Sequence, residues 1–167
     1  MIVLAAIAAA SVAADPAVGR LTDRAKACIT ANAADVERAE PGLADAETFL
    51  LESLCAQPVS VLQQYQTSVV WLESMRHQQP AEYDDDDSPI VDPKMRARMK
   101  VLAAKQREQY ARAVVSEETG ELVMPKDAPT NFGFIISNSR SGITASAEIR
   151  AFAAKALLDA RKARQTR

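Results

Sequence analysis

The two cysteines of this 167-residue chain, Cys28 and Cys55, are the residues whose chemistry the sequence specifies best. Both lie on apolar stripes of helical periodicity, and Pro41 and Gly42 are the strong helix breakers between them, which predicts two antiparallel helices. Cys28 lies thirteen residues before Pro41, and Cys55 lies thirteen residues after Gly42. At about 1.5 Å per residue, both stand about 20 Å from the turn, at the same height on facing helices. The sequence therefore predicts a Cys28–Cys55 disulfide.

Metal binding and nucleophilic catalysis have little support in the remaining residues. His77 is the only histidine, so two thiolates and one imidazole do not complete a four-ligand zinc site. A Ser-His-Asp or Cys-His device would have to use His77, whose neighbours form no catalytic motif. Glu47 with Glu52, or Glu117 with Glu118, is compatible with a small carboxylate-using hydrolase, as are such pairs in any acidic protein. We expect no enzyme activity, and no cofactor is predicted.

Four consecutive aspartates, at 84–87, lie in a proline-containing acidic segment at 80–93. A calcium loop alternates its ligands and places a glycine at its sharp turn, and this run does neither. A solvated linker held open by self-repulsion is favoured. In a third interpretation, the aspartates neutralise the cations that begin the next helix and oppose its dipole: Lys94, Arg96, Arg98 and Lys100.

Contact with a protein partner has one candidate segment, an apolar run that is unusual for a loop. Burial of this run over the helices is favoured, and exposure would make it a partner contact through Phe132, Phe134, Ile135 and Ile136. Nucleic-acid binding is not predicted, because the basic stretches at 94–112 and 161–167 offer only Tyr110 for stacking.

Helical periodicity predicts the elements that position these residues. Asp15 and Pro16 form a start signal for the first helix, whose apolar stripe contains Val18, Leu21, Ala25, Cys28, Ile29, Ala33 and Val36. A second helical segment covers 43–79, with a kink or break near Gln57 because Pro58 interrupts it. Its apolar residues are Leu50, Leu51, Leu54, Val61, Leu62, Tyr65, Val69, Leu72 and Met75.

The third helix is predicted over 94–118, ended by Gly120, with Met95, Met99, Leu102, Tyr110 and Val114 on one side. The last helix begins near Ser146 and buries Ile149, Phe152, Ala153, Ala156 and Leu157. Between them, at 121–142, the helical period vanishes. The apolar runs at 122–124 and 132–136 either pair as a small β-hairpin or pack as an irregular loop. The predicted fold is all-α or nearly so, with four to five helices beginning with a disulfide-linked αα-hairpin.

The first fourteen residues carry no charged side chain and are too short to span a bilayer. With small residues at 12–14, they resemble a cleavable signal peptide, leaving 15–167 as a single helical domain. We therefore expect an exported protein, periplasmic or secreted, without a membrane span in the mature chain, which agrees with a disulfide. The alternative is a buried N-terminal helix, as in a virion component.

Basic and acidic side chains nearly balance, at 20 and 22, so there is no whole-molecule field for nucleic acid or anionic lipid. We expect a non-catalytic protein that acts on a protein partner, as an accessory subunit, adaptor, inhibitor or chaperone-like binder. A homo-oligomer is compatible with this interpretation. The alternatives are a structural component of a larger assembly, such as a virion or an envelope machine, and the small hydrolase.

Overall fold

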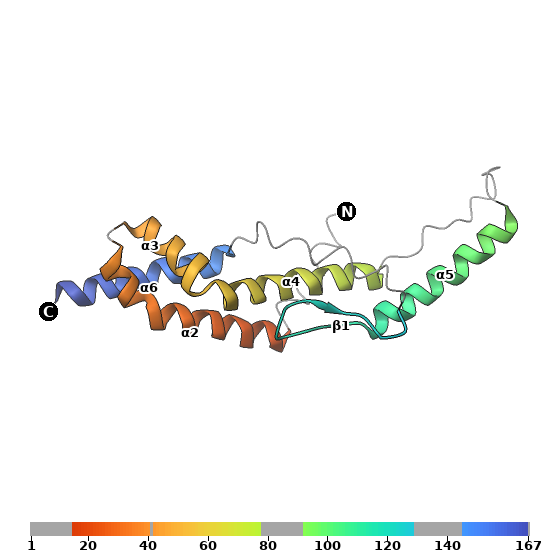
Figure 1. The fold of residues 1–167 in the computed structure, drawn as a ribbon, viewed down its shortest axis with the longest axis horizontal. Coiled ribbons are helices and arrows are strands. Elements are labelled where there is room, and N and C mark those ends of the chain that lie inside the picture. Colours follow the sequence, from red (N-terminus) through yellow and green to blue (C-terminus); the bar gives the residue numbers. More distant parts are fainter. Residues whose placement is uncertain (1–14, 41, 78–91, 129–144, 167) are drawn as a thin grey trace.

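The computed structural model describes residues 15–40, 42–77, 92–128 and 145–166. Their elements are α2 (Pro16–Ala39), α3 (Leu43–Phe49), the π-helix η1 (Leu50–Leu54), α4 (Ala56–His77), α5 (Pro93–Arg112), β1 (Val114–Val115), β2 (Leu122–Val123) and α6 (Ala147–Gln165). The molecule is elongated, and α5 extends past the end of α4 (Figure 1). The predicted all-α class, with five α-helices among the described residues, is confirmed.

Helix α2 begins where the sequence predicts. The Asp15 carboxylate accepts a hydrogen bond from the backbone N–H of Ala17 at 2.8 Å, and Pro16 occupies the first turn. Its buried apolar residues recur at steps of three or four: Ala17, Leu21, Ala25, Ile29, Ala33 and Val36. Helix α2 packs against both α4 and α6. The buried alanines at 25, 33 and 153 provide small surfaces in this helix-on-helix core.

The predicted disulfide hairpin is confirmed. Helix α2 and the η1–α4 segment are joined by the Cys28–Cys55 bond, with a Cα–Cα distance of 5.9 Å. The interruption predicted near Gln57 lies at Cys55, whose backbone angles of φ −108° and ψ 18° separate η1 from α4. Pro58 lies in the first turn of α4, where its missing N–H breaks no helical hydrogen bond.

The predicted C-terminal end of the third helix is wrong. The helix ends at Arg112 instead of 118, because the β-branched Val114 and Val115 form a strand. This strand pairs antiparallel with β2, matching Val114 with Val123 and Val115 with Leu122. Residues 122–123 therefore pair with an upstream strand that the sequence analysis does not predict. The segment 132–136, the other candidate partner, lies outside the described residues.

Gly120 does not end a helix but lies in the turn between β1 and β2. Its φ is +73°, a conformation that glycine adopts without strain. A Cβ atom there would lie 2.7 Å from both Tyr65 N and Val61 O. Ser68 Oγ also donates a hydrogen bond to Gly120 O at 2.8 Å. The hairpin therefore rests directly on the backbone of α4.

The last helix follows its prediction. Ser146 Oγ accepts a hydrogen bond from Ile149 N at 3.4 Å, and Ile149, Ala153 and Leu157 are buried in the main core. None of the helices in the described ranges is both long and apolar enough to cross a membrane.

Candidate functional site

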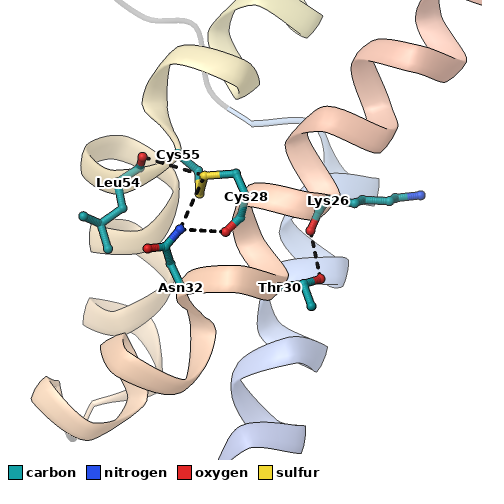
Figure 2. Close-up of a disulfide and its surroundings, with 6 residues drawn as sticks. All are labelled: Lys26, Cys28, Thr30, Asn32, Leu54 and Cys55. Carbon is teal, nitrogen blue, oxygen red and sulfur yellow. Dashed lines mark hydrogen bonds between the residues drawn. A yellow bond between two sulfur atoms is a disulfide. The ribbon is translucent and has the colours of Figure 1, made fainter.

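The disulfide joins the sulfur atoms of the two cysteines of the chain, so neither cysteine offers a thiolate nucleophile (Figure 2). Cys55 is fully buried and Cys28 is partly buried. Asn32 Nδ2 donates a hydrogen bond to Cys28 O at 2.8 Å and lies 3.7 Å from its Sγ. Leu54 O lies 3.8 Å from Cys28 Sγ. Because the bond joins two helices and is largely buried, we interpret it as a structural crosslink.

Among the catalytic candidates derived from the sequence, Glu47 and Glu117 each lie beside an arginine. His77 is exposed, with its Nε2 3.4 Å from Glu73. Glu117 pairs with Arg20 at 2.6 Å, and this hydrogen bond and charge lower the pKa of the Glu117 carboxyl. The general acid of a glycosidase needs a raised pKa, so that it stays protonated near neutral pH. Glu47 lies 3.5 Å from the guanidinium of Arg150. In the described part of the chain, no three potential metal ligands come together.

A shallow groove of about 290 Å³ lies between α2 and α6. Alanines form much of its wall, with Thr30 and Phe152, and its only charged lining residues are Lys155 and Asp159. Carboxylate catalysis requires at least two converging acids, and this groove offers one.

Polar contacts at both ends of α2 tie it to neighbouring helices. Glu37, only 2% exposed, accepts hydrogen bonds from Arg161 Nε at 2.9 Å and lies 3.1 Å from Arg164 Nη2, which ties α2 to α6. At the other end, Tyr65 Oη donates to Asp15 Oδ2 at 2.9 Å. Burial and this hydrogen bond raise the pKa of Tyr65 to about 12.

Helix α5 carries exposed apolar side chains that packing within the described part of the chain does not explain. Its C-terminal end is firmly attached: the rings of Trp71 and Tyr110 meet edge to face, 5.5 Å apart, and Ala113 is fully buried. Arg76 donates hydrogen bonds to Tyr110 O at 3.1 Å and to Ala113 O at 2.9 Å. These contacts fix where the helix leaves the bundle.

The N-terminal half of α5 projects from this attachment and exposes large apolar side chains. Met95 is 59% exposed, Met99 45%, Val101 56% and Leu102 60%. The sequence predicts Met95, Met99 and Leu102 on one side together with Tyr110, and only Tyr110 is buried. We call Met95, Met99 and Leu102 the α5 seam. Exposed apolar residues grouped in this way are typical of an interaction site.

The charge of α5 differs from that of the whole chain. The helix carries seven basic residues and one acidic residue, and Arg98, Lys105 and Arg107 are exposed. Sequence reasoning missed this site because it considered the apolar side of the helix and its cations separately. Their combination on one helix was the available signal. The predicted contacts at Phe132, Phe134, Ile135 and Ile136 lie outside the described residues and stay a prediction.

In comparisons with known proteins, no family model, curated protein or solved structure matched the chain significantly.

Proposed function

We propose that this chain is an exported, non-catalytic protein that binds a protein partner through α5, as an accessory subunit, adaptor, inhibitor or chaperone-like binder. The observation that carries the proposal is the α5 seam, because three large apolar side chains are exposed on a helix that is firmly attached at its other end.

Export is supported by the disulfide, since such bonds form and persist in oxidising compartments. The lowered pKa of Glu117 favours binding over hydrolysis, because a glycosidase general acid needs a raised pKa. A structural role in a larger assembly is a second candidate, favoured by the elongated shape (Figure 1). Both candidates require that a protein covers the α5 seam.

Site-specific photo-crosslinking in the cells that produce the protein tests this proposal. A photoreactive residue at Met99, in the seam, is compared with one at Ala104, which is exposed on a different face of the same helix. We expect a discrete protein adduct from position 99 and little from position 104. Equal labelling at both positions, or no adduct from position 99, would contradict a binding site at the seam.

A further inference from the structure

Building on the proposed function, we propose that the α5 seam binds an acidic amphipathic helix of the partner protein. The partner helix would pack one apolar side against Met95, Met99 and Leu102 and place carboxylates beside the cations that border them.

The spacing of the seam is that of a helix–helix contact. Met95, Met99 and Leu102 are separated by four and then three residues, the alternation found at the contact positions of coiled coils. The same alternation next reaches Gln106, which is partly buried, and then Gln109 and the C-cap residue Ala113, which are both buried. Ala113 packs in one cluster with Leu72 of α4. The seam is thus the exposed continuation of a face that is already used to pack against a helix.

The seam is also too narrow for a membrane surface. Helices that lie in a bilayer interface bury a broad apolar face, whereas a strip with one contact side chain per turn is typical of a coiled-coil seam. Arg98 is directly adjacent to Met99 in sequence, and it is exposed on the border of the strip. A nucleic acid would pair with such cations but would leave three apolar side chains without apolar contacts.

The charges select an acidic helix over a second copy of this chain. Arg98 and Lys105, seven residues apart, follow the same edge of the seam, at positions that in coiled coils choose the partner by charge. Glu108 is the only acidic residue of α5, so pairing α5 with α5 would bring cations against cations. A partner helix with glutamates at its own border positions would place carboxylates opposite Arg98 and Lys105.

A designed peptide provides the probe. It carries leucine at the contact positions and glutamate at the border positions, and a matched peptide has lysine in place of each glutamate. Binding to the complete, disulfide-bonded chain is measured by fluorescence anisotropy. We expect the glutamate peptide to bind at least about tenfold more tightly than the lysine peptide, and its affinity to fall as salt is added.

Two variants assign the binding to the seam. Arg98→Glu with Lys105→Glu should reverse the preference between the two peptides, and Leu102→Asp should weaken both by about tenfold or more. Lys155→Glu with Lys162→Glu, at exposed positions of α6, changes the net charge equally and should leave the preference unchanged. Circular dichroism and the melting temperature establish that each variant is folded.

Four results would overturn the proposal. One is equal affinity for both peptides, and another is unaltered binding by Leu102→Asp. The third is binding to phosphatidylglycerol vesicles without binding to either peptide, which would make the seam a membrane contact. The fourth is peptide binding only after Asp84–Asp87 are changed to asparagine, which would make the chain's own acidic run the occupant. If crosslinking from Met99 persists while the peptide fails, the proposed function stands and this inference does not.

Discussion

The β1–β2 hairpin rests on α4 through its turn at Gly120, and the substitution Gly120→Ala tests that contact. The added Cβ would lie 2.7 Å from Tyr65 N and from Val61 O, both backbone atoms of α4. Neither can move aside as a flexible side chain would. The alanine must also adopt φ +73°, which glycine tolerates and L-residues disfavour.

The expected loss of stability combines these two effects. The left-handed backbone conformation costs about 1–2 kcal/mol, and the overpacking costs a further 1–3 kcal/mol or so. A total of about 3 kcal/mol would lower the melting temperature by about 6–12 °C in a chain of this size. Thermal unfolding followed by far-ultraviolet circular dichroism, supported by urea titration, measures both quantities.

Gly19→Ala is the matched control, because it makes the same chemical change within helix α2. A Cβ at Gly19 would meet no heavy atom within 4 Å, and alanine is the better helix former by about 0.5–1 kcal/mol. The two substitutions should therefore shift the melting temperature in opposite directions. If Gly120→Ala matched the wild type or exceeded it, the hairpin would not rest on α4 as described.

The other contacts give four further predictions. Free-thiol titration of the denatured, unreduced protein should find none, and reduction should remove about 3.6 kcal/mol of stability for a loop of about 28 residues; two reactive thiols would contradict the bridge. Glu37→Gln should lower the free energy of unfolding, measured by urea titration, by about 1–3 kcal/mol. Asp35→Asn, which removes the exposed pair with Arg38, should lower it by less than about 1 kcal/mol. Equal losses would refute a structural role for the Glu37 contacts. Since the folded pKa of Tyr65 is raised, its contribution to stability is present below about pH 10 and is lost as the pH rises through about 12. Absorbance titration should show a tyrosine that ionises near pH 12, and Asp15→Asn should lower that pKa. N-terminal sequencing of the mature protein should begin near Asp15, and recovery of an intact Met1 end from the cytoplasm would defeat the export hypothesis.

The elements that the sequence predicts well are those whose signals are local. Asp15 and Pro16 specify the start of α2 through one carboxylate and one fixed backbone angle. The disulfide follows from equal distances to one turn, because helical rise converts residue counts into height. Neither prediction requires information on how the rest of the chain packs against these helices.

The sequence analysis missed the β1–β2 hairpin because its determinants are not local. Val114 continues the apolar side predicted for α5, and only the pairing of 114–115 with 122–123 makes this segment a strand. Gly120 has the sequence signal of a helix end, but its tight contact with the backbone of α4 comes from a helix more than forty residues earlier. The π-helix before Cys55 likewise has no signal that distinguishes it from an α-helix.

Helix α5 shows a limit of periodicity even where the apolar side of the helix is predicted correctly. Met95, Met99 and Leu102 do lie on the side of the helix that contains Tyr110, but α4 packs only against the C-terminal end of that side. Periodicity indicates which residues share a face and contains no information on how far the covering helix extends.

The α5 seam leaves a local conflict in the folded chain, because large apolar side chains exposed to water are unfavourable. Conflicts between local preference and structure gather at functional sites, where a binding partner resolves them. An apolar surface alone would cover Met95, Met99 and Leu102 but would offer no opposite charge to the exposed Arg98 and Lys105, and a polyanion alone would do the reverse. A helix with an apolar strip bordered by carboxylates meets both groups of side chains, and this is the physical reason to look for that partner before any other.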